Sequence, residues 1–199
     1  TRKESSAASD VYKRQGKSTL MKILAGYESP TTGEVVVDGA VRVPGGGSRA
    51  AEAQGIVLIH QEFNLADDLT IAQNIFLGHE IKRGPFLDDK AMREKTRAAL
   101  AQVGLPLDPD TRVRKLIVAE KQLVEIARAL ARNARLLIMD EPTATLTPGE
   151  TERLFALMAG LKAAGVTIIY ISHKLDEVER TTDEVVVMRD GLLVALSLI

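Results

Sequence analysis

The fold of this chain is decided by one stretch, Leu136-Leu137-Ile138-Met139-Asp140-Glu141-Pro142-Thr143, in which a short apolar run ends in two carboxylates. An uninterrupted apolar run of this length is typical of a strand buried on both faces of a parallel sheet. Ligands of open α/β sheets bind outside the carboxyl ends of such strands. We therefore predict a strand over 136–139 that presents Asp140 and Glu141 to a binding crevice. An acidic turn capped by Pro142 is the simpler alternative.

The segments around this stretch predict a mainly parallel sheet of the α/β class. Residues 55–59 and 166–171 are further apolar runs bounded by polar residues. Residues 151–164, which lie between two of these strands, repeat apolar side chains on one helical face. Strand, helix and strand in this order form a right-handed crossover in a parallel sheet. Another helix, over 119–132, precedes the central strand.

The middle of the chain differs from the rest. Residues 69–78 and 88–103 have a helical pattern, and no segment between Gln61 and Leu116 predicts a strand. We therefore expect a helical subdomain, over about residues 62–132, inserted into the α/β core.

Two hairpins are expected outside this middle part. In each case an Asp-Gly pair separates two short apolar runs, 35–37 from 41–43 and 185–188 from 192–194. Asp-Gly between apolar runs favours a tight turn between antiparallel strands.

The composition excludes several classes of function. The 199-residue chain contains no cysteine, which excludes disulfides and thiolate metal sites. Its net charge of -1 gives no basic excess of the kind that binds nucleic acid, so we expect no nucleic-acid partner. No apolar run approaches the roughly 20 residues that span a bilayer. The composition is therefore typical of an ordinary globular domain.

Gly16-Lys17-Ser18-Thr19, followed by an apolar helical pattern, resembles the second half of a phosphate-binding loop. A glycine lets the backbone approach a phosphate, and the N–H groups at a helix start face the anion. Lys17 would reach the β- and γ-phosphates and Ser18 would ligate Mg²⁺. A chance Gly-Lys-Ser at an ordinary helix start is the alternative. The full pattern also requires glycine where the chain has Val11, and an apolar strand that residues 2–14 do not provide.

Four side chains at the ends of predicted strands are candidates for acting on a bound nucleotide. Asp140 would hold Mg²⁺, and Glu141 would orient and polarise the attacking water. His173, which follows the strand over 166–171, could contact the γ-phosphate. Gln61, which follows the strand over 55–59, could ligate Mg²⁺ or touch the water. Taken singly, His173 and Gln61 are equally well explained as polar residues after a strand.

Taken together, these motifs resemble an ATP-binding-cassette (ABC) transporter ATPase domain, a branch of the P-loop NTPases. The matching segments, in chain order, are the end of Walker A (Gly16, Lys17, Ser18, Thr19), the Q-loop glutamine (Gln61), the signature (Leu116, Ile117, Val118, Ala119, Glu120), Walker B with its catalytic glutamate (residues 136–141), the D-loop (residues 144–147) and the switch histidine (His173). The start of the helix over 119–132 also suits an anion, besides packing an apolar face. The resemblance predicts an ABC ATPase domain over residues 16–195.

A narrower resemblance concerns residues 59–65 and 69–78. They are similar to the first of the two tandem ATPase domains in monosaccharide importers of the ribose, galactose and xylose type. This resemblance implies an ATPase subunit that couples hydrolysis of ATP, with Mg²⁺, to sugar uptake at the cytoplasmic face of the cell membrane. It leaves the transported sugar open.

The resemblance also implies partners. Two ABC domains close head to tail, so the signature segment would act at the nucleotide site of a second ABC ATPase domain. Residues 61–85 would face transmembrane permease subunits, which receive sugar from a periplasmic sugar-binding protein.

The chain departs from the family pattern at several places. Ile117 replaces the signature serine, which removes a hydroxyl that would bond the partner site's γ-phosphate. We interpret residues 1–15 as a non-native or disordered stretch and residues 196–199 as a non-native tail of a truncated chain. Two alternatives therefore stay open: a non-transport ABC ATPase module, or a catalytically impaired fragment with an incomplete Walker A.

Overall fold

The computed structural model describes residues 16–42 and 46–198. The expectations for residues 1–15, including Val11, and for Val43 and Ile199 lie outside this range. The centre of the fold is a three-stranded parallel sheet in the order β3 (Ile56–Ile59), β6 (Leu136–Asp140), β7 (Thr167–Ile171). The three predicted strands and their parallel pairing are thus confirmed, and the chain has the predicted α/β class. β3 and β6 are largely buried, whereas β7 is only partly buried and its Thr167 is exposed.

Alternate residues of the sheet face two separate apolar clusters, because successive side chains of a strand point to opposite faces. Leu137 and Met139 of β6 belong to the larger cluster, which includes the buried face of α7 (Pro148–Ala163). Ile138 belongs to the smaller cluster, together with Met21 of α2 (Lys17–Leu24). The sheet is therefore covered on both faces, which explains its uninterrupted apolar strands.

The start of α7, the helix between β6 and β7, is set by a capping motif in the sequence. Thr147 accepts a hydrogen bond from the Glu150 N–H, and the Glu150 carboxylate accepts one from the Thr147 N–H at 2.8 Å. This reciprocal capping box, followed by Pro148 at the first helical position, fixes the start of α7. Leu154, Phe155, Met158 and Leu161 then lie on its buried face.

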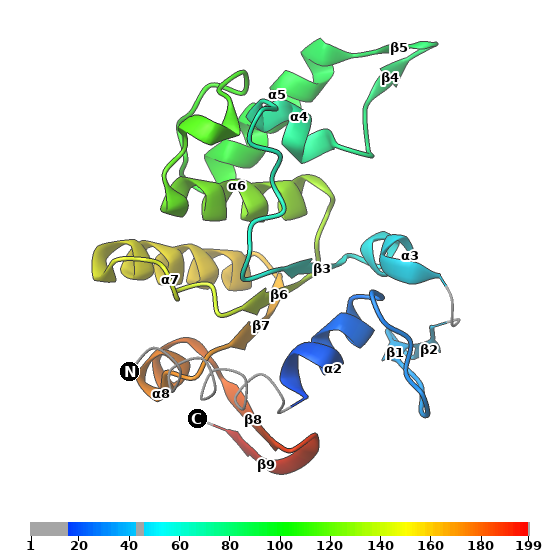
Figure 1. Cartoon of the computed structure of the whole chain (residues 1–199), viewed down its shortest axis with the longest axis vertical. Coiled ribbons are helices and arrows are strands. Elements are labelled where there is room, and N and C mark those ends of the chain that lie inside the picture. Colours follow the sequence, from blue (N-terminus) through cyan, green and yellow to red (C-terminus); the bar gives the residue numbers. More distant parts are fainter. Residues whose placement is uncertain (1–15, 43–45, 199) are drawn as a thin grey trace, which may run out of the picture.

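Three helices form one end of the molecule, above the sheet in Figure 1. They are α4 (Ile71–Phe76), α5 (Asp89–Gln102) and α6 (Val118–Ala131). The expected absence of strands in this part was wrong, because β4 (Lys82–Arg83) pairs with β5 (Phe86–Leu87). Strands of two residues carry no readable periodicity, and no Asp-Gly pair separates these two runs.

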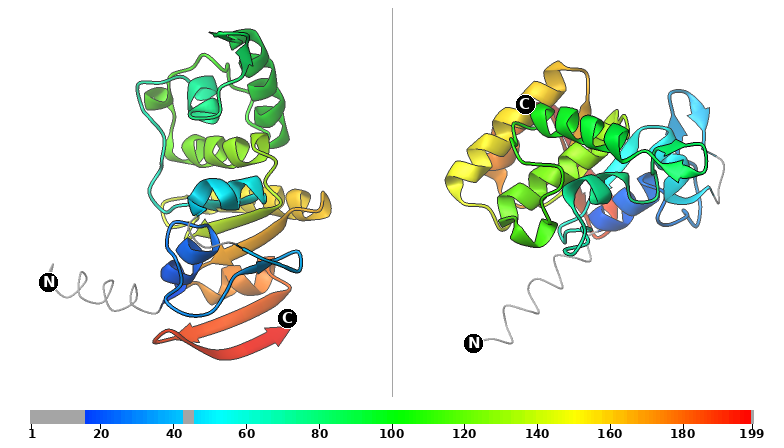
Figure 2. Two further views of the ribbon diagram at one scale, coloured as in Figure 1. Left: turned by 90° about the vertical axis from the view of Figure 1, so that its right-hand side faces the viewer. Right: turned by 90° about the horizontal axis from the view of Figure 1, so that it is seen from above.

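A second hairpin forms the opposite end of the molecule. β8 (Glu184–Arg189) pairs antiparallel with β9 (Leu192–Leu198), as the Asp190-Gly191 turn predicts. Figure 2 shows this hairpin on the α2 side of the sheet, away from the three helices. Shorter elements complete the fold: α3 (Gly47–Ala53), β1 (Val36–Val37) with β2 (Ala40–Val41), and α8 (Leu175–Thr181). Within the described part of the chain, no helix has the length and apolarity to cross a membrane.

Candidate functional site

The start of α2 meets the end of β6. Gly16 caps α2 with a φ of 83°, a left-handed conformation that glycine adopts without a Cβ clash. The Ser18 hydroxyl donates to the Asp140 carboxylate at 3.2 Å, although the two residues lie 122 positions apart in the sequence. The loop Gly16–Thr19 and the carboxylates that follow the central strand therefore form one site.

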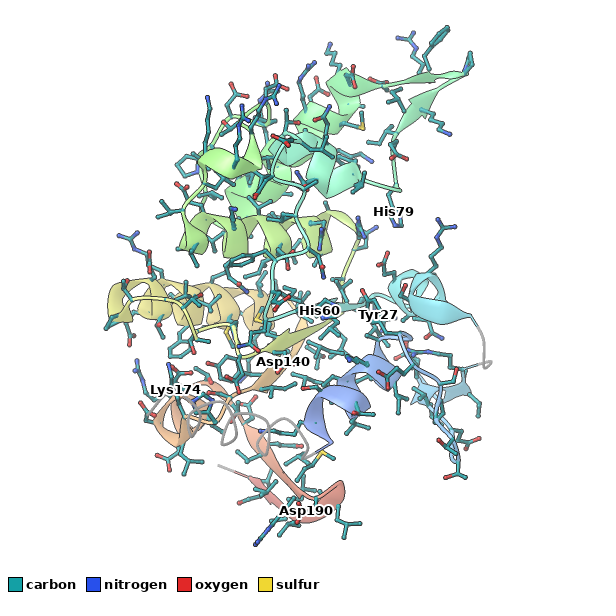
Figure 3. All side chains as sticks on the ribbon, in the orientation of Figure 1. Tyr27, His60, His79, Asp140, Lys174 and Asp190 are labelled. Carbon is teal, nitrogen blue, oxygen red and sulfur yellow. The ribbon has the colours of Figure 1, made fainter. Side chains whose placement is uncertain are left out.

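The Asp140 carboxyl lies in a partly buried, charged environment at the centre of the molecule (Figure 3). Burial raises its pKa above the usual value, and the charge of Glu141 raises it further. The Ser18 hydrogen bond and the positive charge of Lys17 act in the opposite direction. A partly buried carboxylate with a hydroxyl beside it and a lysine nearby is a fitting set of groups for a divalent cation and its phosphates.

Glu141 has a strained backbone conformation. Its φ is 49°, in the left-handed region that costs a residue with a side chain about 1–2 kcal/mol. Its N–H donates to the Ile171 carbonyl at 2.9 Å, which ties the residue to the neighbouring strand. Strain of this kind persists only where the surroundings hold it, and it concentrates at functional sites.

His173 lies against Glu141. Its Nδ1 is 3.1 Å from the Glu141 Oε1, so the residues after β6 and after β7 meet across the carboxyl edge of the sheet. The pairing of β6 with β7 produces this contact, because Asp140 and Ile171 are opposite each other in the register. The sequence-predicted carboxylate and histidine are thus brought together.

Gln61 lies at the same edge and is exposed. Ile59 pairs with Met139, so Gln61 and Glu141 each follow two residues after paired positions on adjacent strands. Its neighbour His60 was not predicted as a site residue. The charge of His60 interacts with Asp140, and its ring packs edge-to-face on Tyr27 with centroids 5.2 Å apart. Burial lowers the pKa of His60, with the Asp140 carboxylate opposing that shift. Its place directly after a buried strand was the available signal.

The segment 116–120 lies elsewhere in the molecule. Leu116 is buried, Ile117 and Val118 are exposed, and the segment opens α6, on the other side of the sheet from α2 (Figure 1). Glu120 accepts a hydrogen bond from the Ile117 N–H at 3.0 Å. Isoleucine has no side-chain oxygen to return such a bond, so the helix start carries only half a capping box. Ile117, Ala119 and Glu120 also line a cleft between α6 and α7.

The site combines a phosphate-binding type of loop with two adjacent carboxylates, and a set of helices lies between β3 and β6 in the chain. Comparison with models of known protein families agrees with this arrangement. The family model for ABC transporters matches residues 15–144. The chain therefore belongs to the ABC transporter family.

Individual relatives and solved structures agree with this assignment. The ribose import ATP-binding protein RbsA 3 of Rubrobacter xylanophilus is 51% identical over 90% of this chain and 36% of its own length. The ribose import ATP-binding protein RbsA of Rhodopirellula baltica is 50% identical over 90% of this chain and 35% of its own length. A nucleotide-free ATP-binding cassette from an ABC transporter superposes with a TM-score of 0.80 at 27% identity, covering 92% of this chain and 76% of that one. The chain spans about a third of the length of the curated relatives that it matches.

Proposed function

We propose that this chain is an ATP-binding and ATP-hydrolysing domain of a bacterial sugar importer, in which hydrolysis drives sugar uptake. The observation that carries the proposal is the meeting of two pairs, Ser18 with Asp140 and Glu141 with His173, at one edge of the sheet. Similarity to ribose import ATP-binding proteins supports the sugar class.

Lys17, Ser18 and Asp140 would hold the nucleotide. The N–H groups at the start of α2 and the Lys17 ammonium would neutralise phosphate charge. Ser18, Asp140 and Gln61 would hold Mg²⁺ through their side-chain oxygens, because magnesium combines few protein oxygens with phosphates and water. Bound Mg²⁺ would supply neutralisation of charge on the phosphate oxygens.

Glu141, His173 and Gln61 would handle the attacking water. The Glu141 carboxylate accepts a hydrogen bond from the water and orients it towards the γ-phosphate. His173, held 3.1 Å from Glu141, fixes the carboxylate and can donate towards the phosphate. Positioning of this kind is the main contribution of a protein to phosphoryl transfer.

The segment 116–120 would act on a second ABC ATPase domain. The exposure of Ile117 and Val118, on the far side of the sheet from α2, suits a head-to-tail pair, in which the start of α6 faces the partner's nucleotide. Ile117 presents no hydroxyl there, so the contact relies on the N–H groups of the helix start.

Residues 61–85 would face the permease subunits at the cytoplasmic side of the membrane, with a periplasmic sugar-binding protein as the indirect partner. Beside this segment lies a groove of about 320 Å³, lined in part by Tyr27, Asn64, Leu77 and Arg132. Reversal of the exposed charges at Lys82 and Arg83 should weaken capture of the importer's own permease in a pull-down. Undiminished capture would contradict this placement.

The function is tested by measuring magnesium-dependent phosphate release from ATP, with Glu141→Gln and Glu179→Gln as matched variants. We expect slow release by the chain itself, because Val11 and Ile117 depart from the family motifs. Glu141→Gln should retain ATP and lower release by about 10²-fold or more, because the base is lost. Glu179→Gln, the same chemical change on exposed α8, should have no effect. Release that survives Glu141→Gln, or failure to bind ATP, would overturn the proposal.

A further inference from the structure

Glu177 of α8 is a buried carboxylate for which the proposed chemistry has no use. Its side chain is 7% exposed, yet both its oxygens are occupied. The donors to its Oε2 are the hydroxyls of Thr143 at 2.7 Å, Ser172 at 3.2 Å and Tyr170, and the donor to its Oε1 is the Lys174 ammonium at 2.8 Å. Hydrogen bonds to an ionised acceptor are the strong ones, so these contacts hold their donors firmly.

Three of the four donors, Thr143, Ser172 and Lys174, come from two loops of the candidate site, and the fourth, Tyr170, lies in β7. Thr143 follows Glu141 by two residues and is itself buried, with 2% of its surface exposed. Ser172 and Lys174 are the two neighbours of His173 in the chain. The Lys174 N–H also donates to the Ser172 hydroxyl at 3.1 Å, which closes the turn around His173. One carboxylate therefore fastens the loop after β6 and the loop after β7.

The strained backbone conformation of Glu141 persists only if neighbouring contacts hold it in place. Its left-handed φ of 49° is unfavourable for a glutamate, and the Ala144 N–H donates to the Glu141 carbonyl at 3.1 Å across the turn that contains Thr143. If the Thr143 hydroxyl lost its acceptor, this turn could relax to an ordinary conformation. Glu141 would then leave the position at which it contacts His173.

We propose that Glu177 is a positioning residue, which sets the distance between Glu141 and His173 by binding Thr143 on one side and Ser172 with Lys174 on the other. The consequence for turnover rests on the proposed ATPase function. The geometry of the two loops can be tested without it.

The decisive variant is Glu177→Gln, which keeps the size of the side chain but replaces one acceptor oxygen with a donor. Displacement of a catalytic pair by a fraction of an ångström to 1 Å lowers turnover by about 10- to 100-fold. We expect this fall in kcat with KM for Mg-ATP unchanged, because the side chains that donate to Glu177 are not the ones proposed to hold the nucleotide. Ser172→Ala, which removes one donor, should give a smaller fall of the same kind. Glu179→Gln, on the same helix but exposed, should match the wild-type chain.

Amide hydrogen exchange followed by NMR gives the second readout. The Glu141 amide, bonded to the Ile171 carbonyl, should exchange faster in Glu177→Gln, while amides of α5 keep their wild-type rates. An unchanged kcat together with unchanged exchange at Glu141 would overturn the proposal. So would a uniform acceleration of all amides with a rise in KM, since that pattern shows a purely structural role. If the wild-type chain hydrolyses no ATP, the proposed function fails, and exchange at Glu141 alone decides the role of Glu177.

Discussion

At the scale of single residues, the N-cap of α6 is occupied by a side chain that cannot accept a hydrogen bond. Ile117 occupies the N-cap, where serine, threonine, aspartate or asparagine accepts a bond from the first turn of a helix. Its side chain is 61% exposed, so little burial is lost if it is replaced. Glu120 already supplies its half of the capping box.

Ile117→Ser should therefore stabilise the chain by about 0.5–2 kcal/mol, because the new hydroxyl accepts a hydrogen bond at the helix start. Denaturant unfolding monitored by circular dichroism measures the change. Ile117→Ala is the matched control, since it removes the same apolar surface without adding an acceptor. Equal stability of the serine and alanine variants would show that the cap does not form.

The Glu177 carboxyl should make stability depend on pH. Burial acts to raise its pKa, but the hydrogen bonds from Lys174, Tyr170 and Thr143 outweigh burial and hold the pKa below the usual glutamate value of 4.5. A lowered folded-state pKa contributes stability above the unfolded-state value, and this contribution is lost as pH falls through the folded-state value. The difference in Tm between the wild-type chain and Glu177→Gln should thus be largest above about pH 5 and shrink at lower pH. A constant difference across this range would contradict the ionised state of Glu177.

At the scale of elements, α6 is fastened to the segment that follows Gln61. The Glu125 carboxylate, which is 1% exposed, accepts from the Asn64 N–H at 2.8 Å and from Arg128 at 3.2 Å. Arg128 in turn donates to the Asn64 carbonyl at 2.7 Å. Helix α6, which begins with the segment 116–120, is therefore linked directly to the loop after β3.

Arg128→Ala should cost about 3–5 kcal/mol of stability, because it leaves the Glu125 charge buried without its cationic partner. Urea unfolding measures this loss. Arg93→Ala is the control, since Arg93 pairs with Asp110 where both side chains are exposed, and such a pair contributes about 0–1 kcal/mol. Similar losses of stability in Arg128→Ala and Arg93→Ala would show that burial does not strengthen the contribution of the Glu125–Arg128 pair.

At the scale of the whole molecule, the β8–β9 hairpin leaves many apolar side chains in solvent. The exposed members are Val186, Val187, Leu192, Leu193, Val194, Leu196 and Leu198. Patches of this kind on the surface of a single chain favour association, and strand edges add unpaired backbone groups.

The chain should therefore self-associate as its concentration rises, and Leu196→Lys should reduce that association. Light scattering over a concentration series measures it. Ser197→Lys adds the same charge at the next position of β9 without removing apolar surface, so it should have the weaker effect. An equal effect of both variants would attribute the association to net charge instead.

The α/β class, the three strands of the parallel sheet, the helix between the last two and both hairpins that contain Asp-Gly could be predicted from the amino-acid sequence. These features follow from local patterns, because periodicity and turn chemistry act over a few neighbouring residues. The order of the motifs from Gly16 to His173 was also readable, because each motif is contiguous. The β4–β5 hairpin was missed because its two-residue strands have no period and no Asp-Gly pair separates them, whereas Asp38-Gly39 marks the equally short β1 and β2.

Which of these residues meet could not be predicted, because their contacts depend on how the chain folds in three dimensions. Ser18 contacts Asp140, and Glu141 contacts His173, because the parallel pairing of β6 with β7 and the packing of α2 on the sheet bring distant segments together. The left-handed backbone of Glu141 and the four donors around Glu177 depend on the same packing. No local pattern specifies such contacts, since they arise from the register of strands and the burial of side chains that lie far apart in the chain.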